Sequence, residues 1–492
     1  MLFWLGQQRS MTRFLLELFP RFRRQLAWLT LLVVCLLPRI LAARTFSQQF
    51  EHIKLVASRD LLYRFLYAMP KGGDLHQHFN LSNFAESWLL LATDPKVTQN
   101  NIFYTRARPR DCPNSPSTAM PRFSTIQKSV YDALPPCQKE EYVSLSALLP
   151  EERALFISGL KLDKDEEGRQ EFFDAIGQRI GDLGRDPNLA GAALVDNMRR
   201  FSAEGLRYME VFVVGPRFID IYGQPIAVER GVQILRDRLL SPDALATGMT
   251  VRFLATIVRH HPDAESQIEK AYELVAKHRD LFVGINVAGR EEDGRGHALR
   301  FVDVFRRMRT HYSNIPLSLH AGESEAPGTQ VKDTLLLGAN RIGHGTNLLS
   351  DSSTVLLMRG NRFLIETSLL SNQLLKYVPD IKVHPFPEFL RIGIPVCLNT
   401  DDRGAFDSNL TDEFFAAVTN FNLTWEEIIA IGRNSIQHSF AEPPVRDRLL
   451  REYEAAVKRF ELQYFGDDWA DKLRLINLPK SGYARRKLGI GP

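Results

Sequence analysis

The stretch Ile394-Pro-Val-Cys-Leu-Asn-Thr-Asp-Asp402 joins a short apolar strand to a polar end that carries two carboxylates. The same form recurs at Gly73-Asp-Leu-His-Gln-His78, at Ile315-Pro-Leu-Ser-Leu-His-Ala-Gly-Glu323 and at Arg341-Ile-Gly-His-Gly345. In each stretch a histidine or a carboxylate stands where a short hydrophobic strand meets a loop. In barrel enzymes the active site lies at the carboxyl ends of the strands, so these side chains are expected to gather there.

Strands of this kind alternate with helix-like segments along most of the chain. The expected strands lie near Gly73–His76, Leu206–Val214, Val251–Val258, Phe282–Val287, Ile315–Leu319, Arg341–Ile342, Phe363–Glu366 and Pro395–Leu398. The expected helices between them include Leu189–Ala203, Ala227–Leu240, Ala264–His278 and His297–Thr310. Short connections between alternating strands and helices imply a parallel sheet with right-handed crossovers. Eight such units predict an α/β fold of the (β/α)8 barrel type.

The barrel is expected to span residues 71–440 and to carry additions at both ends. An N-terminal helical extension is predicted over 44–70, because apolar residues recur on one helix face between about 46 and 69. Residues 441–492 are expected to form a C-terminal helix followed by a tail. The tail is basic and contains glycines from Pro479 onward, so we expect it to be loose.

An insertion is predicted at residues 95–150, after the first strand. This segment is rich in proline and polar residues and has no sustained period, which favours a small subdomain or a functional cover over an ordinary loop. It contains Cys112 and Cys137. In an oxidising compartment these two cysteines would form a disulfide, and in a reducing one they would be two free thiols. Cys397 lies within an apolar strand and reads as a small buried residue.

The first 43 residues have the features of a secretory signal peptide. Three arginines at 21, 23 and 24 precede an apolar run of about 12 residues and the small pair Ala42-Ala43. The run is short for a membrane span, which needs ~20 residues, although an uncleaved anchor is the alternative. We therefore expect a secreted or periplasmic protein with no stable membrane association once the segment is cleaved.

The charge balance argues against a nucleic-acid partner. The whole chain has a formal net charge of +4, and residues 1–43 contain six arginines and one glutamate, so the remainder has a formal charge of −1. Charged residues make up 24% of the chain, which is ordinary for a soluble globular protein. No basic domain remains that could bind a phosphate backbone.

Four of the side chains at strand ends suit a metal ion. His76 and His78 alternate along a strand, so both point to one face of it. Alone, a pair of this kind is more often two polar surface histidines. Together with His320 and Asp401 it supplies three imidazoles and a carboxylate, for which Zn²⁺ is the natural candidate.

Three more residues provide acid, base and substrate-binding groups. His344 lies between two glycines, where it could act as a general base on water. The alternative is a histidine in a tight turn that hydrogen-bonds a carbonyl. Glu323 lies three residues after His320 and can donate a proton if burial raises its pKa. The alternative is a solvated carboxylate in a loop. Asp402 faces the opposite way from Asp401 on a regular strand, so it is expected to contact substrate unless the pair forms a simple turn.

The chain resembles the adenosine deaminase family in the order and spacing of these motifs. The motifs that carry the resemblance are Met69-Pro-Lys-Gly-Gly-Asp-Leu-His-Gln-His78, His320-Ala-Gly-Glu323, Arg341-Ile-Gly-His-Gly345, Asn399-Thr-Asp-Asp402, Glu366-Thr-Ser-Leu-Leu-Ser-Asn372 and His384-Pro-Phe386. The layout is similar to the secreted adenosine deaminase–growth factor branch, which has an export signal, an N-terminal extension used in dimerisation and a disulfide-bearing insertion. That resemblance implies a homodimer.

The resemblance also implies a reaction and a role for each residue. His76, His78, His320 and Asp401 would bind one zinc ion per chain. Glu323 would protonate the purine at N1, and His344 would activate or orient the water that attacks C6. Asp402 would hydrogen-bond N7, and the backbone amide of Gly289 would face N3. The expected function is exported, zinc-dependent deamination of adenosine and 2′-deoxyadenosine to inosine products and ammonia.

Two positions depart from the family pattern. Asn286 stands where the fourth strand of the family usually has an aspartate, which can change metal affinity. Phe79 and Asn80 occupy the stretch where the family commonly has an aspartate that reaches the ribose, although Asn80 can still donate and accept hydrogen bonds. Glu210, at the end of the second strand, is a substitute candidate for the sugar contact.

Three other functions remain open from the sequence. The enzyme could deaminate a different 6-aminopurine nucleoside, which the changes at Asn80 and Asn286 suggest. The chain could be a secreted binding or signalling protein with a vestigial site, although all the inferred ligands, the acid and the base are present. A nuclease or phosphoesterase would usually need a second metal, and the sequence has no second carboxylate cluster for one.

Overall fold

The computed structural model describes residues 45–491, apart from 114–119, 293 and 325–327. The predicted signal peptide therefore lies outside the described residues. Within the described part of the chain, no helix is both long enough and apolar enough to cross a membrane.

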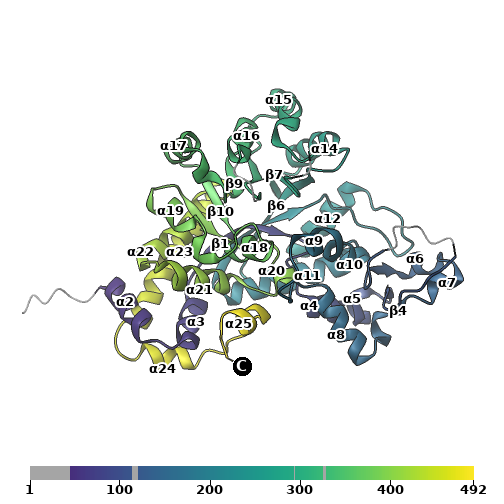
Figure 1. Cartoon of the computed structure of the whole chain (residues 1–492), viewed down its shortest axis with the longest axis horizontal. Coiled ribbons are helices and arrows are strands. Elements are labelled where there is room, and N and C mark those ends of the chain that lie inside the picture. Colours follow the sequence, from purple (N-terminus) through teal and green to yellow (C-terminus); the bar gives the residue numbers. More distant parts are fainter. Residues whose placement is uncertain (1–44, 114–119, 293, 325–327, 492) are drawn as a thin grey trace, which may run out of the picture.

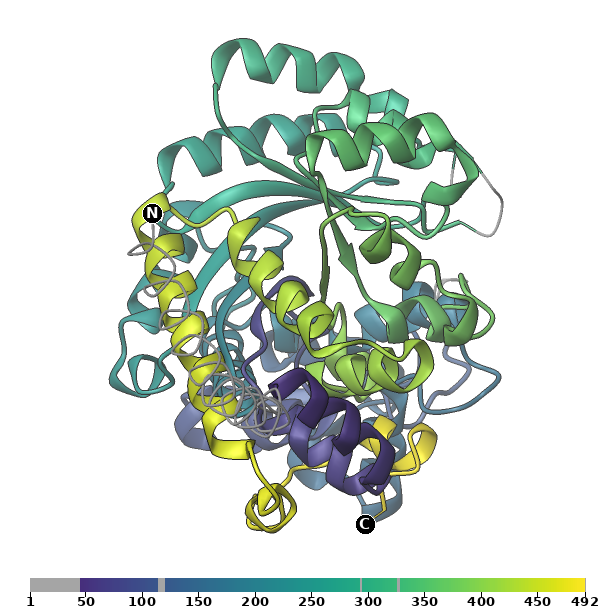
Figure 2. The ribbon, with the colours of Figure 1, turned by 90° about the vertical axis from the view of Figure 1, so that its left-hand side faces the viewer.

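The described strands include an eight-stranded sheet in which neighbouring strands are parallel. Its members in order are β1 (Gly72–His78), β5 (Leu206–Val213), β6 (Thr250–Val258), β7 (Phe282–Ala288), β8 (Leu317–Ala321), β9 (Arg341–His344), β10 (Leu364–Thr367) and β11 (Val396–Leu398). The first and last strands meet where the Asp401 amide donates to the His76 carbonyl at 2.9 Å and the His78 amide donates to the Asp401 carbonyl at 3.2 Å. The predicted (β/α)8 barrel is confirmed, with its helices outside the strands (Figures 1 and 2).

Helices follow the strands in the expected alternation. They are α11 (Pro187–Ala203), α12 (Val228–Leu239), α13 (Pro242–Leu245), α14 (Ala264–Lys277), α15 (Val302–His311), α16 (Gln330–Leu336), α17 (Ser352–Asn361), α18 (Leu369–Leu374), α19 (Phe386–Arg391), α20 (Arg403–Phe406), α21 (Leu410–Phe421) and α22 (Trp425–Gln437). Short 3₁₀ turns accompany them at η5 (Ala298–Phe301), η6 (Leu348–Ser350) and η7 (Ile381–Val383). Local chemistry sets the boundaries: α11 begins after Asp186, whose carboxylate accepts from the amides of Asn188 and Leu189.

The N-terminal extension consists of two helices, α2 (Phe46–Val56) and α3 (Arg59–Ala68), so the expectation of one helix between about 46 and 69 is wrong in this detail. The chain is extended at Ala57 and Ser58, and the Ser58 hydroxyl accepts from the Leu61 amide, which starts the second helix. The two helices pack on the barrel through aromatic side chains, with the Phe50 and Trp425 rings 5.5 Å apart.

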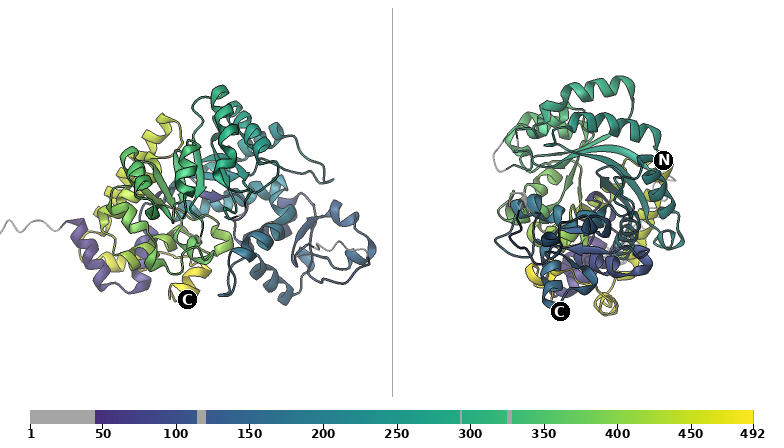
Figure 3. Two further views of the ribbon diagram at one scale, coloured as in Figure 1. Left: turned by 45° about the horizontal axis from the view of Figure 1, so that its top comes forward. Right: turned by 90° about the vertical axis from the view of Figure 1, so that its right-hand side faces the viewer.

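Residues 85–113 and 120–159 form a small body on one side of the barrel, opposite α2 and α3 (Figures 1 and 3). It holds a three-stranded antiparallel sheet, in the order β3 (Thr125–Gln127), β2 (Phe103–Thr105) and β4 (Val143–Ser144). Its other elements are α4 (Ala85–Thr93), α5 (Pro95–Thr98), α6 (Lys128–Asp132), α7 (Pro136–Lys139), η2 (Leu145–Ala147) and α8 (Pro150–Gly159). A separate apolar cluster that includes Trp88, Phe103 and Phe156 lies beneath them.

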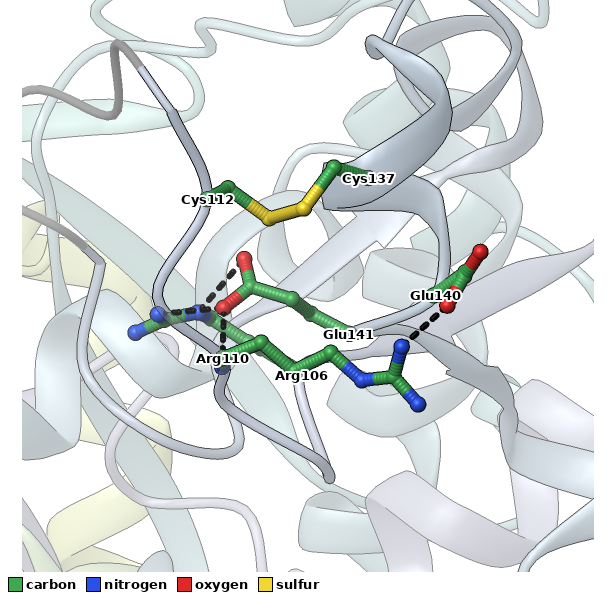
Figure 4. Close-up of a disulfide and its surroundings, with 6 residues drawn as sticks. All are labelled: Arg106, Arg110, Cys112, Cys137, Glu140 and Glu141. Carbon is green, nitrogen blue, oxygen red and sulfur yellow. Dashed lines mark hydrogen bonds and ion pairs between the residues drawn. A yellow bond between two sulfur atoms is a disulfide. The ribbon is translucent and has the colours of Figure 1, made fainter.

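Cys112 and Cys137 form a disulfide in this body, which confirms the paired alternative (Figure 4). The bond joins the chain after β2 to α7. Beside it, Arg106 pairs with Glu141 at 2.7 Å, and Arg110 pairs with Glu140. Cys397 is free and buried, as expected.

A segment between this body and α11 covers part of the open end of the barrel. It comprises α9 (Arg169–Glu171), the π-helical turn η3 (Phe172–Ile176), α10 (Gly177–Ile180) and the 3₁₀ turn η4 (Gly181–Gly184). We call residues 169–184 the cover segment. It is tied to the loop after β7 by Asp174, whose carboxylate accepts from Arg290 at 2.6 Å.

The chain ends in α23 (Pro443–Tyr464), α24 (Trp469–Arg474) and α25 (Gly482–Lys487). The expectation of a loose tail after Pro479 is wrong. The Tyr483 amide donates to the Asp407 carbonyl at 2.8 Å, and the Ser481 hydroxyl donates to Asp412 at 2.6 Å. Tyr483 and Ile490 are buried, so the tail packs as part of the folded body.

Candidate metal and active site

Four side chains predicted as metal ligands converge at the carboxyl ends of three strands. The ligand atoms of His76, His78, His320 and Asp401 all lie within 4.8 Å of one another. Asp401 Oδ1 is 3.5 Å from His76 Nε2 and 3.3 Å from His78 Nε2. His78 Nε2 is 3.3 Å from His320 Nε2. The barrel therefore brings the four residues together although 325 positions separate the first from the last.

These separations fit a tetrahedral ion. Bonds of ~2.0–2.2 Å from zinc to nitrogen or oxygen place tetrahedral ligands roughly 3.4 Å apart. His76 Nε2 and Asp401 Oδ1 are buried and have no hydrogen-bond partner among the described residues. Buried polar atoms of this kind are costly unless something else satisfies them. A divalent cation at the centre of the four atoms would do so, and the residues present therefore fit zinc.

A smaller group shares His320 and adds Glu323 and His344, whose Oε1 and Nε2 atoms are 3.4 Å apart. It offers three ligand atoms, one of which belongs to the four-residue group. The four-residue group is the better metal site, because it supplies a full tetrahedral set of ligands.

Three of the four ligands, His76, His320 and Asp401, are oriented by a partner behind them. His76 Nδ1 is 2.8 Å from Glu366, and the Ser371 hydroxyl donates to Asp401 Oδ2 at 2.7 Å. Burial alone would lower the pKa of His76, but hydrogen bonds and charge from Asp401 and Glu366 outweigh it and raise that pKa to about 10. Such partners fix the ring orientation of metal-binding histidines.

Asn286 is the partner of His320. Its Nδ2 lies 2.8 Å from the Ser318 carbonyl and 3.1 Å from His320 Nδ1, while its Oδ1 makes no hydrogen bond within the described residues. A histidine that binds metal through Nε2 carries its proton on Nδ1 and needs an acceptor there. A flip of the Asn286 side-chain amide would place Oδ1 beside His320 Nδ1 as the acceptor. Even then, Asn286 supplies no negative charge.

The two aspartates after β11 take different directions. Asp401 has a φ of +53°, a left-handed conformation that is uncommon for residues other than glycine. Its backbone hydrogen bonds to β1 hold it there, so its carboxylate points at the metal ligands. Asp402 is also buried, and its Oδ1 has no partner among the described residues. Burial and the charge of Asp401 raise the pKa of Asp402 well above its usual range.

Glu323 is held at the site by a buried ion pair that sequence reasoning did not identify. The Glu291 carboxylate accepts from the Gly322 amide at 3.0 Å and pairs with Arg259 at 3.3 Å. Glu323 itself is 4% exposed. Burial, together with the charges of Asp401 and Glu291, raises the pKa of Glu323 well above its usual range. This shift favours the protonated carboxyl, which can act as a proton donor.

A chain of hydrogen bonds fixes the proton position on His344. The Phe386 amide donates to His384 Nδ1 at 3.0 Å, so neutral His384 carries its proton on Nε2. His384 Nε2 then donates to Asn372 Oδ1 at 3.0 Å, and Asn372 Nδ2 donates to His344 Nδ1 at 3.0 Å. Burial and the neighbouring His76 lower the pKa of His344 to about 3. Neutral His344 therefore carries its proton on Nε2, on the side of Glu323.

These groups surround a cavity of about 300 Å³. The predicted residues that line it are His78, Gly289, His320, Glu323, Asp401 and Asp402. Sequence reasoning missed the apolar part of the lining, which includes Phe172 and Phe173 of the cover segment and Leu375 after α18. In the sequence these residues are marked only by the adjacent aromatic pair Phe172-Phe173 in a polar stretch. Their contact with the cavity depends on the tertiary fold, which the local sequence does not show.

The two candidate sugar contacts lie elsewhere. Glu210 is fully buried in the barrel, where its carboxylate accepts from Tyr208 at 2.7 Å and pairs with Arg341. It does not line the cavity, so the structure contradicts a sugar contact at Glu210. Asn80 lines a neighbouring hollow that shares His78 and Leu81 with the cavity.

Comparison with known proteins gives a consistent family match. The family model described as Adenosine deaminase matches residues 144–456. An adenosine deaminase-like protein of Drosophila melanogaster is 30% identical over 246 residues, which cover 50% of this chain and 69% of the relative. An adenosine deaminase of Enterococcus faecalis is 33% identical over 200 residues, which cover 40% of this chain and 57% of the relative. The chain thus spans somewhat more than half the length of the second relative.

Among solved structures, an amidohydrolase from Burkhoderia ambifaria with bound zinc has a similar fold. The TM-score is 0.58 at 16% identity, and the match covers 82% of this chain and 95% of that one. At this identity the likeness concerns the fold.

Proposed function

This chain belongs to the adenosine deaminase family of hydrolases, and on that premise we propose that it is a zinc-dependent enzyme that removes the 6-amino group of adenosine and 2′-deoxyadenosine. One observation carries the proposal. Unsatisfied metal-ligand atoms on His76 and Asp401 lie beside two buried carboxyl groups, Glu323 and Asp402, that line one cavity with apolar walls.

His76, His78, His320 and Asp401 would hold the ion. When bound, zinc supplies a Lewis acid that makes hydroxide available near neutral pH. The separations of the four ligand atoms and their lack of other partners support this assignment.

The purine would be held by groups that match its ring nitrogens. Glu323 keeps a proton that it can donate to N1, which makes C6 more electrophilic. The raised pKa of Asp402 likewise favours a protonated carboxyl, which would donate to the acceptor N7. The Gly289 amide would face N3, and a side chain here would be obstructed because a Cβ would lie 3.0 Å from His260 Nδ1. Phe172 and Phe173 offer apolar surface against the purine.

His344 would orient the attacking water. Its Nε2–H is the outward end of the relay through Asn372 and His384, so neutral His344 acts as a hydrogen-bond donor to the water oxygen. In the reaction, the water oxygen bonds to C6 and the C6–N6 bond breaks. One proton of the water leaves with the amino group as ammonia, and the other replaces the proton that Glu323 gave to N1. The purine product is the 6-oxo compound inosine or 2′-deoxyinosine.

The setting of the enzyme is also part of the proposal. We propose that residues 1–43 direct export, so that the mature enzyme is secreted or periplasmic. The Cys112–Cys137 disulfide is compatible with an oxidising compartment. We further propose a homodimer in which the N-terminal helices α2 and α3 take part, as in the growth-factor branch that the layout resembles.

The test uses protein that starts near Arg44 and is loaded with zinc. Ultraviolet absorbance follows adenosine as it becomes inosine, and Glu323→Ala is the control. Conversion by the wild type that is lost in the variant is expected. Zinc bound at one ion per chain with no conversion of adenosine or other 6-aminopurines would refute the catalytic proposal and favour a binding protein with a vestigial site. Absence of zinc binding would refute the metal site itself.

A further inference from the structure

A second hollow of about 450 Å³ adjoins the metal cavity. The two share four lining residues, which are His78, Leu81, Gly177 and Val214. The metal cavity alone, at about 300 Å³, is at the lower end of the sizes typical of ligand sites. A substrate whose purine faces His78 and Glu323 can therefore extend past His78 into the second hollow.

The polar lining of the second hollow favours an anion. Its charged residues are Arg185 and Arg217, and no carboxylate lines it among the described residues. Asn80 also lines it, and Asn80 Oδ1 is buried without a hydrogen-bond partner in the described part of the chain. The two guanidinium groups are donors suited to phosphate or carboxylate oxygens, and the uncharged Asn80 amide adds an NH₂ group to the same lining.

Backbone contacts bring these three residues together. Asn80 packs directly against Gly184, where a Cβ would lie only 2.4 Å from Asn80 Nδ2, so Arg185 follows immediately beside the amide. The Arg185 carbonyl accepts from the Ile219 amide at 3.0 Å, which places the loop that contains Arg217 alongside. Arg185, which directly follows the cover segment, and Arg217, in the loop after β5, therefore line one opening.

Neither arginine is fully neutralised. Arg217 is exposed and has no ion-pair partner among the residues that the structure describes. Arg185 pairs with Asp182 at 3.3 Å, but its side chain is 51% exposed, and the other Asp182 oxygen accepts from the Gln127 amide. The hollow thus keeps a positive potential at its mouth.

We propose that this hollow, which we call the arginine hollow, binds an anionic group on the 5′ end of the sugar. The substrate class would then be a 6-aminopurine nucleoside 5′-monophosphate in preference to the free nucleoside. This inference rests on the proposed deamination and deepens it. Asn80 is central, because it lines the hollow beside Gly184 and carries no charge. An aspartate there would repel a phosphate, whereas the Asn80 amide can donate to it.

The first test compares deamination of adenosine and adenosine 5′-monophosphate by the zinc-loaded wild type. We expect kcat/KM to be at least about tenfold higher for the monophosphate, and this preference to weaken at high salt because exposed charges are screened. Arg217→Gln and Arg185→Gln should each lower the ratio of the two kcat/KM values by roughly tenfold, as expected for a lost charge-assisted hydrogen bond. Asn80→Asp should lower it through repulsion.

The matched control is Arg306→Gln, since Arg306 on α15 is 71% exposed and pairs only with Asp303 among the described residues. It should leave the ratio unchanged. A wild type that prefers adenosine would overturn the inference and leave the deaminase intact. A preference for the monophosphate that survives all three substitutions in the hollow would also overturn it.

Binding of the products separates this inference from the deaminase proposal. Calorimetry would compare inosine and inosine 5′-monophosphate on the zinc-loaded wild type and on Arg217→Gln. Tighter binding of the monophosphate, lost in the variant, supports the arginine hollow even if no substrate is deaminated. Equal binding of both products overturns it. Should Arg217→Gln fail to fold, Asn80→Asp provides the same comparison.

Discussion

Two buried clusters of charge share the interior of this barrel, and they differ in how completely their atoms are paired. At the first, Arg341 lies between Glu210 and Glu366 and pairs with both. Glu210 also accepts from the Phe440 amide at 2.6 Å and from Tyr208 at 2.7 Å. The carboxylates of this cluster are fully engaged within the protein. Arg341 Nε makes no hydrogen bond among the described residues, but it lies 2.5 Å from Glu366 Oε1 in an ion pair, so the cluster needs no ligand.

The second cluster lies at the carboxyl ends of the strands and is incomplete. His76 Nε2, Asp401 Oδ1, Asp402 Oδ1 and His344 Nε2 are buried without a hydrogen-bond partner among the described residues. Glu366 belongs to both clusters, because it also contacts His76 Nδ1. The comparison teaches that burial of charge alone does not mark a functional site. Unpaired atoms that converge on one point do.

The largest expected effect is on catalysis in the incomplete cluster. Glu323→Gln should lower kcat by about 10²–10⁴-fold, because the amide cannot donate a proton to the purine ring as an acid does. Zinc content should stay at one ion per chain, since Glu323 is outside the four-residue group. Steady-state kinetics and metal analysis check both points. The control is Glu229→Gln, a 62% exposed position on α12. Equal rates for wild type and Glu323→Gln would contradict the acid role.

A substitution in the paired cluster should lower the free energy of unfolding. Arg341→Met removes the cation between two buried carboxylates, and breaking such a pair costs about 3–5 kcal/mol in the free energy of unfolding. Urea denaturation of the metal-free proteins measures the difference, with exposed Arg306→Met as the control. A loss no larger than that of the control would mean that the paired cluster does not support the barrel.

Zinc should stabilise the protein through the incomplete cluster only. A ligand at ~1,000 times its Kd stabilises the folded state by about 4 kcal/mol. Thermal unfolding of the wild type should shift upward on addition of zinc, and Asp401→Asn should remove most of that shift because the carboxylate ligand is lost. An equal shift in the variant would place the zinc elsewhere.

The smallest expected effect concerns Asn286 behind His320. Asn286→Asp should tighten zinc binding by about tenfold, since a carboxylate accepts the Nδ1 proton of His320 and adds negative charge near the ion. Competition with a chromophoric chelator measures the affinity. Asn286→Leu, which can accept no proton, should bind zinc more weakly than the wild type. The prediction fails if the aspartate variant binds no more tightly than the leucine variant.

Much of the barrel and of the metal site followed from local sequence patterns. Each strand is a short apolar run, and the ligands stand at strand ends, so period and position identified His76, His320 and Asp401 before any tertiary contact was known. Fold topology then required those ends to meet. The Cys112–Cys137 disulfide was predicted because export leads to an oxidising compartment and because both cysteines lie in the insertion at residues 95–150.

Other features depend on contacts that no local pattern encodes. Glu210 also stands near a strand end, but the guanidinium of Arg341, 131 positions away, turns it into a structural residue. The tail after Pro479 has a loose composition, yet Asp407 and Asp412 give it partners. Phe173 and the Asn372–His384 relay reach the site from segments whose approach is set by tertiary packing.

Metal-dependent turnover is the most direct test of the account. The protein would be stripped with a chelator, dialysed and titrated with zinc while deamination of adenosine and adenosine 5′-monophosphate is followed by ultraviolet absorbance. The expected result is no activity in the metal-free protein and a recovery of activity that rises linearly and ends at one zinc ion per chain. Full turnover by metal-free protein, or recovery that also occurs in Asp401→Asn, would contradict it.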